Sequence, residues 1–116
     1  EIYDLIVRTV IVGRGNTKPV HLHRAASALV KAHAQSQMMY TIEPMLDEEE
    51  ADIYRRGRNA KSVTMAKNAT VTDYRRATGF EALLGYLYLK DELPRILELV
   101  KAAISNYDEK TEKNKE

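Results

Sequence analysis

A single carboxylate, Glu81, interrupts an apolar stretch that reads ATGFEALLGYLYL over residues 77–89. At helical spacing Glu81 shares a stripe with Ala77 and Leu84, and we expect this stripe to face the core. An ionised carboxylate in an apolar interior is so unfavourable that it takes up a proton, pairs with a cation, or opens onto a cleft. The rest of the chain must decide which of these arrangements applies to Glu81.

Positive charge is concentrated in residues 55–76. Seven basic residues lie there with one acid, Asp73, although the whole chain carries a formal net charge of only +1. Cations attract a phosphate backbone, and small polar groups such as those of Ser, Thr and Asn position the phosphates. The stretch therefore indicates nucleic-acid binding, with a solvated loop as the alternative.

The elements that must position these residues are predicted to be helices, because no strand alternation appears. Asp47, followed three residues later by Glu50, predicts a helix start, and Gly57 predicts its end. We expect an ordered loop over residues 58–71. The predicted helices cover residues 1–12, 20–42 as one bent helix or two shorter ones, 47–57, 72–90, and a final segment from Asp91 past Ile104. The fold class is all-α.

Length and composition limit the organisation. A chain of 116 residues forms one domain, here 1–107, and residues 108–116 are predicted to be a charged flexible tail. Because the chain contains no Cys, thiolate metal sites and a cysteine nucleophile are excluded.

No apolar run is long enough to cross a membrane, so we expect a soluble cytoplasmic protein. The first helix begins without Met or a cap, and we expect part of the natural N-terminus to be absent.

Two motifs together resemble a known family. The stretches RGRNAKS (57–62 with the preceding Arg56) and FEALLGYLYL (80–89) are similar to the ribonuclease III family, specifically its small branch, which lacks a double-stranded-RNA-binding domain. The resemblance extends over residues 1–104. It implies the helical-bundle fold of the ribonuclease III catalytic domain and hydrolysis of RNA phosphodiesters.

The resemblance assigns Glu81 as a catalytic metal ligand, since the Glu of this helix binds metal in the family. The implied cofactor is Mg²⁺, with Mn²⁺ as a substitute, and Mg²⁺ prefers such hard oxygen ligands. A purely structural Glu81, protonated or ion-paired, is the alternative. The family's second acidic ligand aligns just before Glu1, so Asp4, about one helical turn further on, is the candidate contributor in this chain. Thr78 replaces an Asp of the larger enzymes, and its hydroxyl could hold a metal-bound water.

The substrate implied by the resemblance is double-stranded RNA, which proteins recognise mainly through its shape and phosphates. The family also implies a homodimer, maturation of large-subunit (23S) ribosomal RNA precursor, and help from a ribosomal protein. Phe80, Leu84 and Tyr88 suit either the core or the dimer interface. The predicted RNA contacts are Arg55, Arg56, Arg58, Asn59, Lys61, Ser62, Lys67, Asn68, Arg75 and Arg76, although Arg75 or Arg76 could instead pair with the acids of residues 47–50.

Two alternatives belong to other functional classes. The first is a non-catalytic helical RNA-binding protein, such as a ribosome-assembly factor, in which Glu81 is structural. Metal-dependent cleavage distinguishes it from the nuclease, because both bind RNA in a salt-sensitive way. The second is a helical interaction module whose basic loop binds an acidic protein, and it predicts no RNA affinity at moderate salt.

Overall fold

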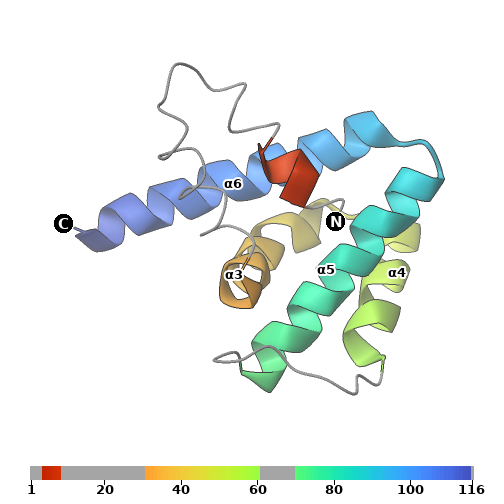
Figure 1. Cartoon of the computed structure of the whole chain (residues 1–116), viewed down its shortest axis with the longest axis horizontal. Helices are drawn as coiled ribbons and strands as arrows, with labels where there is room; N and C mark the ends of the chain where they lie inside the picture. Colours follow the sequence, from red (N-terminus) through yellow and green to blue (C-terminus); the bar gives the residue numbers. More distant parts are fainter. Residues whose placement is uncertain (1–3, 9–30, 61–69, 116) are drawn as a thin grey trace.

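Helices form all the regular structure in the described part of the chain. The computed structural model describes residues 4–8, 31–60 and 70–115. Residues 4–8 are helical, and the later elements are α3 (Ala32–Ile42), the 3-10 turn η1 (Glu43–Met45), α4 (Glu48–Asn59), α5 (Val71–Leu89) and α6 (Leu93–Lys115). Helices α4 and α5 lie side by side and run in opposite directions (Figure 1). The predicted all-α class is confirmed.

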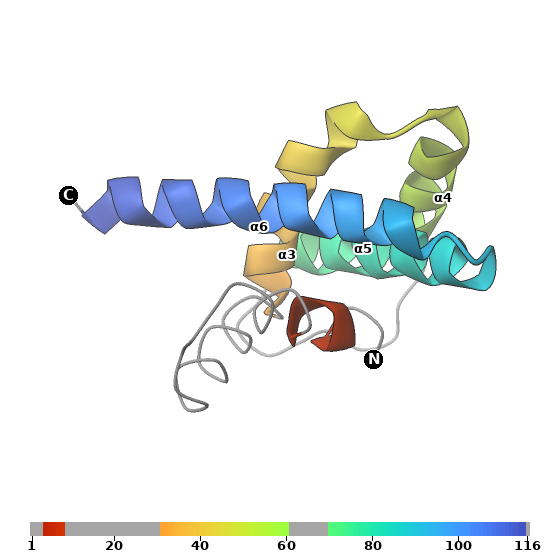
Figure 2. The same cartoon turned by 90° about the horizontal axis from the view of Figure 1, so that it is seen from above.

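The core forms where α3, α5 and α6 meet, with Tyr54 of α4 added from one side. Its largest fully buried side chains include Tyr54, Phe80 and Met38. Ile6 and Val7 belong to the same cluster, so the helical turn over residues 4–8 packs against the bundle. The C-terminal part of α6 extends beyond the other labelled helices (Figure 2).

Several predicted helix boundaries can be compared with the observed ones. The start at Asp47 is confirmed, because its side chain accepts from the Glu50 N–H while the Glu50 carboxylate accepts from the Asp47 N–H. The predicted end at Gly57 is wrong, since α4 continues to Asn59. Helix α6 continues to Lys115, so no helix end marks the predicted boundary at residue 108. Residues 61–69 of the predicted loop lie outside the described residues, as do residues 20–30 of the predicted helix over 20–42, whose remaining part is occupied by α3.

Glycines bring α4 and α5 unusually close together. A Cβ added to Gly57 would lie 2.7 Å from Cβ of Ala82, and one added to Gly79 would lie 2.7 Å from the carbonyl oxygen of Tyr54. Both positions therefore need glycine for packing, which explains why Gly57 sits inside a helix that it was expected to end. In contrast, a Cβ added to Gly85 would meet none of the described residues within 4 Å.

We expect Gly79→Ala to destabilise the protein by about 1–3 kcal/mol, because the added methyl group would be forced against the backbone and ring of Tyr54. Gly85→Ala is the matched control on the same helix. It should stabilise the fold by roughly 0.5–1 kcal/mol, because alanine favours helix and has open space there. Urea denaturation of both variants measures the difference, and equal effects would contradict this account of the α4–α5 contact.

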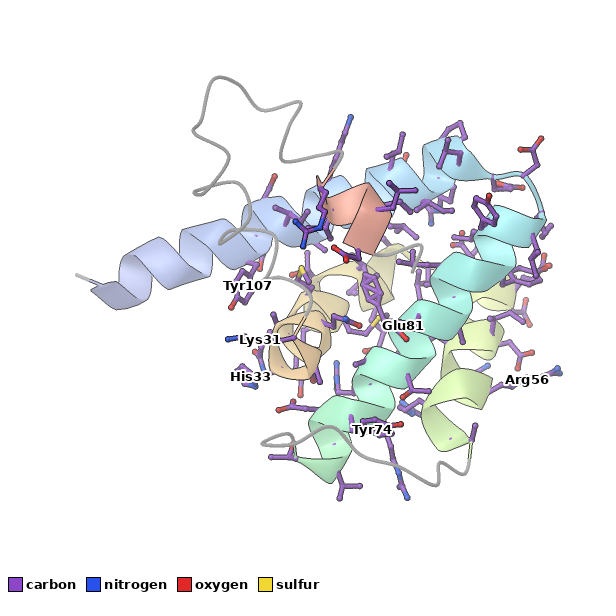
Figure 3. All side chains as sticks on the ribbon, in the orientation of Figure 1. Lys31, His33, Arg56, Tyr74, Glu81 and Tyr107 are labelled. Atoms are coloured by element: carbon purple, nitrogen blue, oxygen red, sulfur yellow. The ribbon has the colours of Figure 1, made fainter. Side chains whose placement is uncertain are left out.

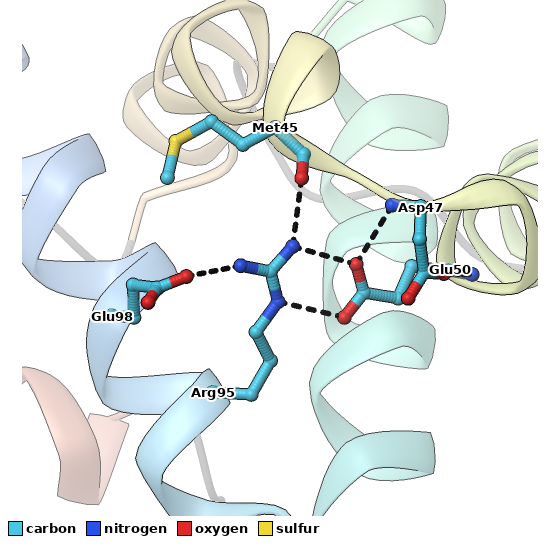
Figure 4. Close-up of polar contacts among 5 residues, drawn as sticks. All are labelled: Met45, Asp47, Glu50, Arg95 and Glu98. Atoms are coloured by element: carbon cyan, nitrogen blue, oxygen red, sulfur yellow. Dashed lines mark hydrogen bonds and ion pairs between the residues drawn. The ribbon is translucent and has the colours of Figure 1, made fainter.

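A buried ion pair ties the start of α4 to α6. The guanidinium of Arg95 donates to both carboxylate oxygens of Glu50, at 2.9 and 2.8 Å, and to the carbonyl oxygen of Met45 at 2.7 Å (Figure 4). Glu50 is the same residue that caps α4 with Asp47. One guanidinium therefore fixes η1, α4 and α6 relative to one another.

Candidate active site

Glu81 lies midway along α5, and its side chain is exposed (Figure 3). The prediction that its stripe faces the core is wrong for Glu81 itself, although Ala77 and Leu84 of that stripe are buried. The buried strip of α5 runs instead through Phe80 and Leu83, since α3 and α4 cover that side of the helix. The carboxylate therefore avoids the cost of burial and remains accessible from solvent.

Thr78 and Gly85 lie about one helical turn before and after Glu81 on α5. The Thr78 hydroxyl donates to the carbonyl oxygen of Tyr74 at 2.9 Å, so its proton is engaged while its lone pairs can still accept. A metal-bound water is a donor, and the hydroxyl oxygen is suited to accept from it. On the other side of Glu81, the position of Gly85 adjoins open space.

Asp4 belongs to the helical turn at the start of the chain, and it is partly exposed. Its carboxylate pairs with Arg8, whose Nε lies 2.7 Å from Oδ1. In the described residues, no three His, Cys, Asp or Glu side chains gather as a metal-binding group. Asp4 as a second contributor beside Glu81 therefore stays a prediction.

The described basic residues flank residues 61–69 from both ends. Arg55, Arg56 and Asn59 are exposed in the last turns of α4, and Arg75 is exposed in the first turns of α5. Asp52 forms ion pairs with Arg55 and Arg56 at 3.7 and 3.1 Å. These pairs partly neutralise the two positive charges, while both arginine side chains remain exposed to solvent. Arg58 is half-buried, with its guanidinium 5.6 Å from the ring centroid of Tyr54. The predicted contacts Lys61, Ser62, Lys67 and Asn68 lie outside the described residues.

Arg76 differs from its neighbour Arg75, because only 13% of its side chain is exposed. Its guanidinium stacks on the Tyr40 ring at 3.6 Å, and NH2 lies 3.7 Å from a carboxylate oxygen of Glu43. We expected that Arg75 or Arg76 could form an ion pair with an acid of residues 47–50. Arg76 does form an ion pair within the protein, but its partner is Glu43. Arg76 as an RNA contact stays a prediction, with a smaller exposed surface than that of Arg75.

One contact near the basic residues was not predicted. His33 of α3 lies with Nδ1 2.9 Å from Oδ2 of Asp73, and this hydrogen bond lowers the pKa of Asp73 below its usual value. Asp73 also donates its backbone N–H to the side chain of Thr70, which caps α5. The only acid of the basic stretch therefore fixes the start of α5 against α3. No local sequence signal connects two residues 40 positions apart.

Comparison with known proteins identifies the family. A family model described as the ribonuclease III domain matches residues 1–92. The chain belongs to the ribonuclease III family. Proteins named Mini-ribonuclease 3 are 49% identical in Enterococcus faecalis, over 97% of this chain and 86% of that protein, and 48% identical in Brevibacillus brevis, over 89% and 77%. This ribonuclease III is therefore an endoribonuclease of the Mini-ribonuclease III branch.

A solved structure supports the same fold. A crystal structure of a protein from Fusobacterium nucleatum matches this ribonuclease III with a TM-score of 0.76 and 31% identity, over 90% of this chain and 84% of that one. The expected family, all-α fold and endoribonuclease class are confirmed, and neither non-catalytic alternative is supported. Among the described helices, none is both long and apolar enough to span a membrane.

Proposed function

We propose that this ribonuclease III cleaves double-stranded RNA in a reaction that depends on Mg²⁺ or Mn²⁺, with Glu81 as a metal ligand. The observation that carries the proposal is the exposed carboxylate in an otherwise apolar stretch of a packed helix. A charged side chain there contributes nothing to the core. Its placement on a rigid helix is what a site that must hold an ion in a fixed position requires.

The donor chemistry at this face fits Mg²⁺. Magnesium is usually held by one or two carboxylates, with waters and substrate phosphates completing its coordination. Glu81 supplies one carboxylate, and Asp4 is the proposed source of another. When bound, the ion would polarise the phosphoryl group and lower the pKa of an attacking water. The protein's own task is to hold the ligand oxygens and to orient the RNA.

Orientation of the RNA is assigned to the exposed arginines beside residues 61–69. Arg55, Arg56 and Arg75 present their guanidinium groups to solvent, and such groups bind phosphates through paired hydrogen bonds. Asn59 is exposed next to them and could bind a sugar or phosphate oxygen. Contacts from Lys61, Ser62, Lys67 and Asn68 complete the proposed surface.

We further propose a homodimer that matures 23S ribosomal RNA precursor in the cytoplasm, with a ribosomal protein shaping the substrate. Exposed apolar side chains near the α5–α6 turn support the dimer: 55% of Tyr88 and 86% of Leu89 are accessible. Phe80 and Leu84 are buried in the core, so Tyr88 is the residue of the three considered that remains available to a second copy.

The proposal is tested by incubating the protein with matched double-stranded RNA, single-stranded RNA and double-stranded DNA, in Mg²⁺ or in EDTA. We expect cleavage of double-stranded RNA in Mg²⁺ alone. Cleavage that persists in EDTA would overturn the metal assignment, and equal cleavage of single-stranded RNA would overturn the substrate.

A further inference from the structure

Gly85 is the helical glycine of α5 that packing within the described residues does not explain. Gly79 and Gly57 are both needed where α4 meets α5, because an added Cβ would come within 3 Å of a neighbour. At Gly85 an added Cβ would meet no atom of the described parts of the chain within 4 Å. Glycine in a helix interior is nevertheless less favourable than alanine, so the reason for this glycine lies outside the packing of the described bundle.

Position 85 lies on the same face as Glu81, one turn further along α5. Side chains on a helix lean towards its N-terminus, so a side chain at position 85 would project over the turn that carries Glu81. The exposed side chains of Tyr88 and Leu89 follow on the next turn. Gly85 thus leaves open the surface between the carboxylate and these two apolar side chains.

The size of this opening suits what the proposed reaction must bring to Glu81. Residues four apart in a helix are separated by about 6 Å along the axis. A Mg²⁺ ion with its first shell of waters is roughly 7 Å across, and a phosphate beside it needs further room. A side chain at position 85 would compete for that volume.

We propose that Gly85 is a specificity-determining residue, which keeps the α5 surface beside Glu81 open so that a hydrated divalent cation and an RNA phosphate fit together there. This inference rests on the proposed function of Glu81. It assigns a role to the missing side chain of Gly85, whose absence admits the ligands.

The test uses the Gly85→Ala and Gly85→Leu variants, with Ser105→Leu at an exposed position of α6 as the control for added surface bulk. Cleavage of double-stranded RNA should fall roughly tenfold with Ala and a hundredfold with Leu. Mn²⁺ binding, followed by electron paramagnetic resonance, should weaken severalfold in the Leu variant. The unfolding temperature of Gly85→Ala should equal or exceed that of the wild type, and Ser105→Leu should behave as the wild type throughout.

Two results would overturn the inference. The first is that the Gly85→Leu variant cleaves RNA at the wild-type rate and binds Mn²⁺ with the wild-type affinity. The other is a change in oligomeric state by light scattering with Mn²⁺ binding intact, which would assign the space to a contact between two copies. Failure of the proposed function is recognised separately, since the wild type itself would then show no metal-dependent cleavage.

Discussion

Glu81→Gln is expected to slow cleavage of double-stranded RNA by roughly 10²–10³-fold, which corresponds to a loss of about 3–4 kcal/mol of transition-state stabilisation. The amide keeps the size of the side chain but is a poor ligand for Mg²⁺. Because Glu81 is exposed, the substitution should leave the unfolding transition nearly unchanged. RNA affinity measured in EDTA should also be nearly unchanged, since the phosphate contacts are assigned to arginines elsewhere.

The matched control is Glu92→Gln, which makes the same change of charge at an exposed position after α5. It should cleave as fast as the wild type at every Mg²⁺ concentration. If Glu81→Gln cleaved like Glu92→Gln, Glu81 would not be a metal ligand and the proposed site would be wrong. If instead Glu81→Gln lost RNA binding in EDTA, its role would be in binding and not in the metal-dependent step.

Local sequence patterns predicted the helices better than the faces they bury. The capping box of Asp47 and Glu50 lies within four residues, so the start of α4 could be predicted from the local sequence. The orientation of α5 depends on α3 and α4, which cover Phe80 and leave Glu81 in solvent. Helical spacing alone could not decide this, because several overlapping stripes of a largely apolar helix have similar hydrophobicity.

The same limit applies to the charges. Arg75 and Arg76 are equivalent in the sequence, yet Arg76 stacks on Tyr40 while Arg75 is exposed. The position of α3, which carries Tyr40, determines which of the two arginines is buried. That position depends on tertiary packing and cannot be predicted from the sequence near residues 75 and 76. The pairing of His33 with Asp73 is of the same kind. Residue types thus predict which chemistry a surface could carry, and the packing of the helices decides which of those side chains are exposed.

Arg95→Met is expected to destabilise the protein by about 3 kcal/mol at neutral pH, because it leaves the Glu50 carboxylate buried without its cation. The Glu50 side chain is 5% exposed and that of Arg95 is 24% exposed, so water replaces the lost contacts only in part. The control is Glu98→Gln, which removes the other carboxylate that contacts Arg95. Since 59% of the Glu98 side chain is exposed, its loss should cost less than about 1 kcal/mol.

The pH dependence of this effect follows from the hydrogen bonds of Arg95, which lower the pKa of Glu50 below its ordinary value of 4.5. A lowered pKa in the folded state stabilises the protein above the unfolded pKa, and this contribution is lost as pH falls through the folded pKa. The difference between wild type and Arg95→Met should therefore be largest at neutral pH and shrink below about pH 4.5. Urea denaturation from pH 3 to pH 7 measures it, and a difference that stays constant over this range would show that Arg95 stabilises the fold through packing and not through the charge of Glu50.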